Sequence, residues 1–168
     1  METKYSSIMK AGVFTQMYVQ IVFAVQNRKA LLKPEIRPQV FEYMSGILSS
    51  LQHKSIIVNG VSSHVHILMG LNPAVSISDT VHDLKRGSSL YINEQRLLSD
   101  RFTWQEGYGG FTYSRSQLDG VYKYIQNQLK HHELVTFKEE YILFLDKFEI
   151  EYDERFLFDF LDDKDDCV

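Results

Sequence analysis

The sequence predicts an α+β fold in which helices pack on one face of a mainly antiparallel sheet. Apolar residues alternate in some segments and recur at helical spacing in others, in the order β-α-β-β-α-β-α. The 168 residues contain no repeat, no low-complexity tract and no long Gly/Ser/Pro linker, so we expect a single domain over residues 1–168. With 44% hydrophobic and 24% charged residues, the composition is that of a soluble globular protein.

The first strand and the first helix follow from two different periods. Alternate residues are apolar over residues 17–25, which predicts a strand. From Glu35 the apolar positions recur at helical spacing as far as Leu51, and Pro38 is tolerated in the first turn of that helix.

Two shorter strands and a second helix come next. Residues 55–58 and 64–69 are apolar runs typical of strands, and the pair Asn59-Gly60 is expected to interrupt them. The second helix is expected to begin at Ser76, which has an acidic residue three positions further on, as in a capping box.

The last elements are a short strand at residues 111–113 and a third helix that begins at Ser116, with Asp119 in the capping-box position. The acidic segment at about residues 149–168 is expected to be partly a helix and partly frayed. The apolar stripe of the third helix consists of Leu118, Val121, Tyr122, Ile125 and Leu129.

Net charge alone argues against a nucleic-acid partner, but its distribution does not. The chain carries −4 overall, while residues 149–168 hold nine acids against two bases, so that the remainder carries +3. A mildly basic body is compatible with DNA without demanding it. No apolar run could span a bilayer, no export signal is evident, and the single Cys167 excludes an intramolecular disulfide. We therefore expect a cytoplasmic protein.

Two histidines, His64 and His66, flank one apolar residue within a predicted strand. Side chains at positions i and i+2 of a strand point to the same face, so the two imidazoles are expected to form a bidentate arm for a divalent metal. Two unrelated histidines on a solvated strand face are the alternative, and the motif alone does not exclude it.

Tyr124 and Gln128 are four residues apart on the predicted third helix and are expected to lie on one face. This face is turned away from the apolar stripe, as a nucleophile with a metal-binding neighbour requires. A surface tyrosine is the alternative. Tyr122 falls inside the stripe and is expected to be a core aromatic residue.

The basic pair Lys85-Arg86 on the second helix is a candidate for phosphate contacts, although a solvated helix face is the commoner outcome. The aromatic residues around Trp104 and Tyr108 could stack on unpaired bases, but packing within the protein is the stronger expectation. His53 and the pair His131-His132 are expected to be surface or capping residues.

Taken together, these segments resemble the single-tyrosine HUH transposases of insertion sequences, which include the REP-associated tyrosine transposases. The resemblance extends over roughly residues 18–158, and it depends on the order and spacing of several short segments. These segments are residues 58–61 with 64–68, 84–85 with 88–89, 102–111, 124–128 with 131–132, and 137–141.

The resemblance implies a ferredoxin-like or RRM-like sheet, used as a homodimer in which the tyrosine can act in trans. It implies that His64, His66 and Gln128 hold Mg²⁺ or Mn²⁺ and that Tyr124 is the nucleophile. Ser63 stands where the family usually has an acidic residue before the first histidine. Loss of that carboxylate would weaken the attraction for a hard cation.

The implied activity is cleavage and rejoining of single-stranded DNA near hairpins through a 5′-phosphotyrosine intermediate. The main alternative is a catalytically inactive, domesticated protein that binds DNA hairpins. A replication-initiator-like or relaxase-like nickase is a further alternative, disfavoured because such chains usually carry additional domains. A small zinc hydrolase built on His64 and His66 lacks an obvious third ligand nearby.

Overall fold

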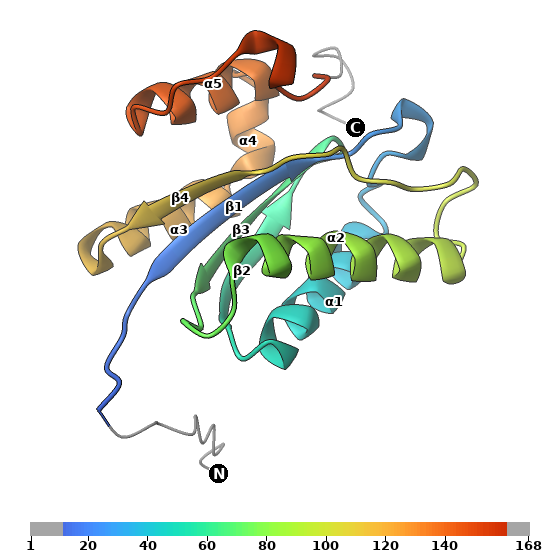
Figure 1. Cartoon of the computed structure of the whole chain (residues 1–168). Helices are drawn as coiled ribbons and strands as arrows, with labels where there is room; N and C mark the ends of the chain where they lie inside the picture. Colours follow the sequence, from blue (N-terminus) through green and yellow to red (C-terminus); the bar gives the residue numbers. More distant parts are fainter. Residues whose placement is uncertain (1–11, 161–168) are drawn as a thin grey trace.

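The structure, a computed structural model, describes residues 12–160 and contains one four-stranded antiparallel sheet (Figure 1). The predicted α+β class is confirmed, and so is the predicted order of the elements as far as the third helix, which two further helices follow. The strand order is β2-β3-β1-β4, so β1 and β3 are the two central strands. The strands are β1 (Tyr18–Ala24), β2 (Lys54–Gly60), β3 (His64–Gly70) and β4 (Gly109–Tyr113).

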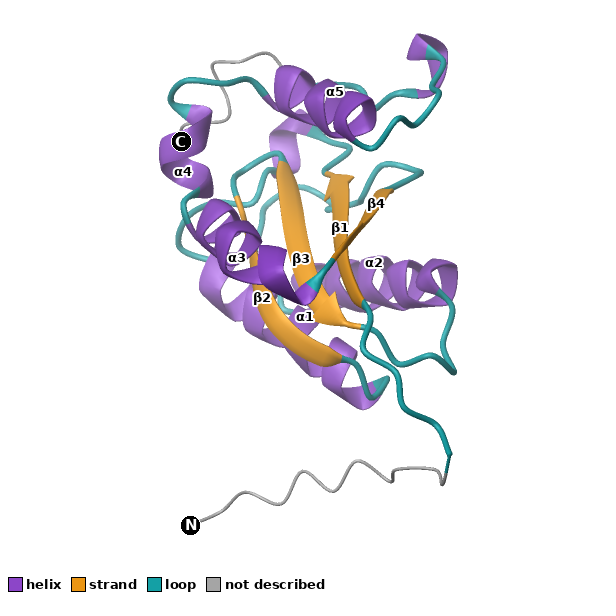
Figure 2. Ribbon diagram, turned by 90° about the vertical axis from the view of Figure 1, so that its left-hand side faces the viewer, coloured by secondary structure: helices purple, strands orange, loops and turns teal. Residues whose placement is uncertain are grey.

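The helices cover both faces of the sheet, whereas the sequence predicted helices on one face only. The first two, α1 (Arg37–Ser50) and α2 (Ile77–Glu94), pack together on one face. The other three, α3 (Leu118–Gln126), α4 (Gln128–His132) and α5 (Phe137–Lys147), lie across the opposite face (Figures 1 and 2). All seven residues of β1 and all seven of β3 are buried, so the central strands need cover on both sides.

The two faces of the sheet differ in composition. On the face covered by α1 and α2, alternate residues of β1 such as Ile21 and Phe23 join Met44 and Leu84 in the main core. On the opposite face a smaller apolar cluster of Tyr18, Leu68, Leu118 and Ile125 lies under α3. His64 and His66 of β3 also lie on this second face, where they pair with Ala24 and Val22 of β1, respectively. The candidate functional residues of β3 therefore lie under the C-terminal helices.

The turn between β2 and β3 lies slightly later than predicted. The pair Asn59-Gly60 was expected to interrupt the two strands. These residues are instead the last two of β2, and residues 61–63 connect β2 to β3. The backbone passes very close here, since a Cβ on Gly60 would lie 2.3 Å from the carbonyl oxygen of His64. Only glycine fits at that approach, so Gly60 determines how tightly β2 leads into the histidine strand.

The third helix begins and ends differently from the prediction. Its first turn is a 3-10 turn with Ser114 and Gln117 as the capping box, in place of Ser116 and Asp119. The helix ends at Gln126, because Asn127 leaves the helical conformation. Tyr124 and Gln128 therefore belong to two successive helices, and the prediction that they share one helix face is wrong.

The prediction for Tyr122 is also wrong, because 39% of this residue is exposed. The side of α3 that meets the sheet is formed by Leu118 and Ile125, with Val121 and Tyr124 packed beside them. The predicted apolar stripe included Leu129 because the helix was assumed to continue past residue 126. Leu129 is 56% exposed and lies outside α3. Tyr124 is covered because α4 and α5 lie against its side of α3, where its ring contacts His131 and Phe144.

The acidic C-terminal segment forms no α-helix between residues 149 and 160, contrary to expectation, but only a 3-10 turn at Glu154–Phe156. The remainder of the segment, with Cys167, lies outside the described residues. The Gln105 amide makes two hydrogen bonds with the backbone of Asp159, and Phe158 packs on Phe137. The last described residues are thus attached to the body of the domain.

None of the helices within residues 12–160 has the length and apolar character that crossing a membrane would require.

Asn59 joins the end of α3 to the sheet. Its side-chain amide donates hydrogen bonds to the carbonyl oxygens of Ile125 (2.8 Å) and Gln126 (3.2 Å), which have no partner within the helix. Asn59→Ala should lower the free energy of unfolding by about 1–2 kcal/mol, because it removes these bonds. Chemical denaturation measures this change. The exposed Asn127→Ala is the control, since its side chain bonds only within α3. An Asn59→Ala protein as stable as the wild type would contradict the role.

A candidate metal centre beside a tyrosine

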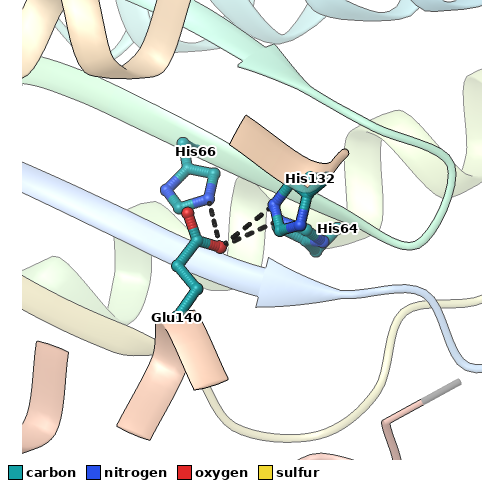
Figure 3. Close-up of side chains that lie close together, drawn as sticks. All are labelled: His64, His66, His132 and Glu140. Atoms are coloured by element: carbon teal, nitrogen blue, oxygen red, sulfur yellow. Dashed lines mark ion pairs between the residues drawn. The ribbon is translucent and has the colours of Figure 1, made fainter. Parts of the chain in front are cut away.

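Four side chains from three elements converge on the second face of the sheet (Figure 3). His64 and His66 come from β3, His132 from α4 and Glu140 from α5. The Glu140 Oε2 atom lies 3.3 Å from Nε2 of His64, 3.3 Å from Nε2 of His66 and 3.2 Å from Nε2 of His132. The two strand histidines are completely buried, and Glu140 is 2% exposed. One carboxylate oxygen is therefore surrounded by three imidazole nitrogens.

This arrangement fits a divalent metal ion. For metal–ligand bonds of about 2.0–2.2 Å, adjacent ligand atoms are separated by about 2.8–3.1 Å in octahedral geometry and by about 3.3–3.6 Å in tetrahedral geometry, so the two together span about 2.8–3.6 Å. The three separations from Glu140 fall in that range, and all four ligand atoms lie within 4.8 Å of one another. The buried group of His64, His66, His132 and Glu140 could therefore hold a metal ion.

The protonation states of the group suit this role. Burial, together with the nearby His64 and His66, lowers the pKa of His132 to about 3, which leaves its imidazole neutral. Burial alone would raise the pKa of Glu140, but His66 and His64 outweigh that effect and bring it to about 2. A neutral imidazole and an ionised carboxylate are the forms in which these side chains bind metals.

Other side chains fix the orientation of the two strand histidines. The Ser63 hydroxyl lies 3.0 Å from Nδ1 of His64, and the Gln20 amide lies 2.8 Å from Nδ1 of His66. The His64 ring also stacks on Phe137, with centroids 3.7 Å apart. Contacts on Nδ1 turn Nε2 toward Glu140, as in metal sites whose ligands are held by surrounding hydrogen bonds. Ser63 thus lies behind His64, and the carboxylate of the group comes from Glu140.

Tyr124 lies at the edge of this four-residue group. Its hydroxyl donates a hydrogen bond to Oε1 of Glu140, and its ring lies 6.0 Å from the ring of His66. His131 Nε2 is 3.4 Å from the same hydroxyl. The two oxygens of Glu140 therefore face different partners, since Oε2 faces His64, His66 and His132 while Oε1 faces Tyr124 and His131.

Gln128 is completely buried beside the four-residue group. Its Oε1 atom lies 3.0 Å from Nε2 of His132, and its amide nitrogen donates to Oε1 of Glu140 at 3.1 Å. The structure thus brings Gln128, Tyr124, His64 and His66 together, although Gln128 belongs to α4. Its role as a metal ligand stays a prediction.

Sequence reasoning missed His132 and Glu140. His132 was expected to be a surface or capping residue but is buried beside Glu140, and His53 is also buried and bonds to Thr80 and to the backbone of Asn72. Glu140 could have been found from helical spacing. It shares the apolar face of α5 with Phe137 and Tyr141, and a carboxylate on such a face must have a partner.

The basic pair of α2 is divided between two environments. Lys85 is partly buried, and its ammonium group donates to the carbonyl oxygens of Gln105, at 2.8 Å, and of Gly107. Burial lowers its pKa to about 8, although Glu106 acts in the opposite direction. Arg86 is exposed on the next position. Lys85 therefore anchors the loop before β4, and the contact of either residue with DNA stays a prediction.

Replacing Lys85 with methionine should lower the free energy of unfolding by about 1–3 kcal/mol, because two loop carbonyl groups lose their donor. Thermal or chemical unfolding measures this change. Arg86→Met should stay within about 0.5 kcal/mol of the wild type. If Lys85→Met is as stable as Arg86→Met, the loop does not depend on this ammonium group.

The chain belongs to the family described as "Transposase IS200 like", which it matches over residues 13–128. No curated protein matches the chain significantly.

Two solved structures share the architecture. One is a candidate transposase from Deinococcus radiodurans R1, with 21% identity, coverage of 71% of this chain and 96% of that chain, and a TM-score of 0.57. The other is a REP-associated tyrosine transposase bound to a REP hairpin, with 12% identity, 76% coverage of each chain and a TM-score of 0.52. At these identities the likeness shows the fold. The family match ends at Gln128, so His132 and Glu140 lie beyond it.

Proposed function

We propose that this protein is a metal-dependent, single-tyrosine transposase that cleaves and rejoins single-stranded DNA near hairpins, with Tyr124 as the nucleophile. The observation that carries the proposal is the shared carboxylate. Glu140 contacts the Tyr124 hydroxyl through Oε1 and faces three histidine nitrogens through Oε2. A nucleophile and a candidate metal centre are therefore separated by one carboxylate group.

In the proposed reaction the phenolic oxygen of Tyr124 forms a bond to the scissile phosphorus, and the bond from phosphorus to the 3′ oxygen breaks. The products are a 5′-phosphotyrosine and a free 3′-OH, and the proton lost by tyrosine balances the proton gained by the 3′ oxygen. The reverse attack by a 3′-OH rejoins DNA without ATP, because the phosphodiester is exchanged and not hydrolysed. Glu140 orients the tyrosine hydroxyl through its hydrogen bond.

His64, His66, His132 and Glu140, with Gln128 beside them, would hold the metal. A bound divalent cation supplies charge stabilisation at a phosphate. Mg²⁺ and Mn²⁺ are the ions expected from the sequence resemblance. Three imidazoles favour a transition metal such as Mn²⁺ within this pair, since Mg²⁺ prefers oxygen ligands.

The proposed substrate is a single strand next to a DNA hairpin. Its support is the family membership and the REP hairpin bound by one protein of the same fold. Lys85 and Arg86 remain the proposed phosphate contacts, with Arg86 the more accessible of the two. A homodimer also remains part of the proposal. The Tyr124 hydroxyl contacts Glu140 of its own chain, which supports cleavage by the tyrosine of the same subunit.

A second candidate function is a DNA-hairpin-binding protein without catalytic activity. The burial of the group favours it. Glu140 lies between Tyr124 and the three imidazoles, in the place that a scissile phosphate would have to enter, and the whole group is enclosed. Under this alternative the protein binds hairpins and forms no covalent product.

A covalent adduct assay separates the two functions. The protein is incubated with Mn²⁺ or Mg²⁺ and labelled single-stranded hairpin DNA from the ends of its own locus, and the products are run on a denaturing gel. A labelled band at the mass of the protein plus DNA, lost with EDTA, supports the transposase. Hairpin binding in a gel-shift assay with no such band under either metal contradicts the transposase and supports the binder.

A further inference from the structure

A cavity of about 250 Å³ lies directly beside Tyr124. It is bounded by α3, by α5 and by the end of β4. Tyr124 and Glu140 are both part of its wall, so the cavity adjoins the candidate catalytic group. The residues that line it are Tyr113, Gly120, Val121, Tyr124, His131, Glu140, Leu143, Phe144 and Lys147.

The walls of the cavity suit a flat, apolar ring. Tyr113 and Phe144 contribute aromatic side chains, and Val121 and Leu143 contribute aliphatic ones. Phe144 is held in place by stacking on Phe111, with ring centroids 4.9 Å apart. A cavity of about 150 Å³ accommodates benzene, so this larger space can hold a nucleobase.

Two charged groups line the cavity, the Glu140 carboxylate and the Lys147 ammonium group, and the ammonium group has the sign that a phosphate requires. Lys147, at the end of α5, is exposed and lines the cavity. A nucleotide that placed its base between Tyr113 and Phe144 would carry its phosphates along a wall that holds the Tyr124 hydroxyl and an ammonium group. Apolar walls with an adjacent cation are the combination by which proteins bind unpaired bases.

We propose that this cavity is a nucleobase subsite, which receives the unpaired base of a nucleotide next to the scissile phosphate. The proposal rests on the proposed function and names the part of the substrate that is bound beside Tyr124. By holding the base, the cavity places the adjoining phosphate at the tyrosine hydroxyl. It also explains why the substrate must be single-stranded, since a paired base cannot enter.

Gly120 provides a way to fill the cavity without removing any side chain. It lies on α3 in the cavity wall, and a Cβ built on it meets no atom within 4 Å. Gly120→Leu therefore projects four carbons into the space that a base would occupy. Gly46→Leu is the matched control, because Gly46 is an exposed glycine of α1 whose Cβ also meets nothing.

The test measures binding of two fluorescent probes by anisotropy at fixed salt. One is an octamer of thymidylate and the other is an octamer of abasic deoxyribose phosphate. The wild type should bind the thymidylate more tightly than the abasic chain. Gly120→Leu should weaken thymidylate binding about tenfold, within the range of one stacked base, and leave abasic binding unchanged. Lys147→Gln should weaken both probes by a similar factor, because phosphates are common to both.

Three results would overturn the subsite. They are a wild type without preference for the base-bearing probe, a Gly120→Leu protein that binds thymidylate normally, and a Gly46→Leu protein that loses as much binding as Gly120→Leu. The proposed reaction is judged separately, because these probes report binding alone. A preserved base preference without any covalent adduct overturns the reaction and keeps the subsite, while a normal adduct with Gly120→Leu binding unchanged does the reverse.

Discussion

Replacing Tyr124 with phenylalanine should abolish the covalent protein–DNA adduct while leaving hairpin binding within about twofold of the wild type. The substitution removes one oxygen atom, the proposed nucleophile, and no other side chain offers a hydroxyl to Glu140 among the bonds of the described residues. We expect the rate of adduct formation to fall by at least about 1000-fold, because a covalent mechanism has no route around its nucleophile. Adduct bands and gel shifts on the same hairpin measure the two properties.

Tyr122→Phe is the matched control for this substitution. Tyr122 lies two residues away on the same helix and is exposed, and it is the next tyrosine to consider as a nucleophile. It should form the adduct at the wild-type rate. An adduct that persists in Tyr124→Phe and vanishes in Tyr122→Phe would move the nucleophile to the outer side of α3.

Replacing His66 with alanine should remove metal binding and adduct formation together. Loss of an outer hydrogen-bond partner typically weakens a metal site by about 10–100-fold, so loss of one of its four candidate ligands should cost at least about 100-fold. Calorimetric titration with Mn²⁺ measures the affinity, and the adduct assay measures the activity. Since His66 is buried, thermal unfolding without metal checks that the variant is folded.

The control for His66→Ala is His82→Ala, because His82 is an exposed histidine of α2 that does not belong to the four-residue group. Its Mn²⁺ affinity and adduct yield should equal those of the wild type. A folded His66→Ala protein that binds Mn²⁺ as tightly as the His82→Ala protein would refute the metal assignment.

Much of the fold could be predicted because its elements are marked locally. Alternation over residues 17–25 and the N-cap at Ser76 each depend on neighbours in sequence, and both correspond to elements of the structure. The division of the helices between two faces was not predictable in the same way. It depends on β1 and β3 being buried on both sides, which short apolar runs do not distinguish from burial on one side.

The candidate site likewise has one part that could be predicted from local sequence and one part that could not. His64 and His66 are brought together by the period of one strand, so their common face follows from spacing alone. Their partnership with His132 and Glu140 depends on how α4 and α5 fold back over the sheet, a long-range property without a local signal. The error over the common face of Tyr124 and Gln128 has a smaller cause. One asparagine, Asn127, ends the helix, and helical phase cannot be carried across such a break.

The order in which the chain is made gives the buried group a further property. His64 and Glu140 are 76 residues apart, and at about 5–20 residues per second the ribosome needs roughly 4–15 s to pass from one to the other. During that interval the emerging sheet can form its histidine strand, but Tyr124 is added only after 60 of the 76 residues and the Glu140 carboxylate only at the end. A nascent chain or a prematurely terminated fragment therefore holds the two strand histidines without the residue proposed to cut DNA. The group that is proposed to act on DNA is therefore complete only after Glu140 has been translated.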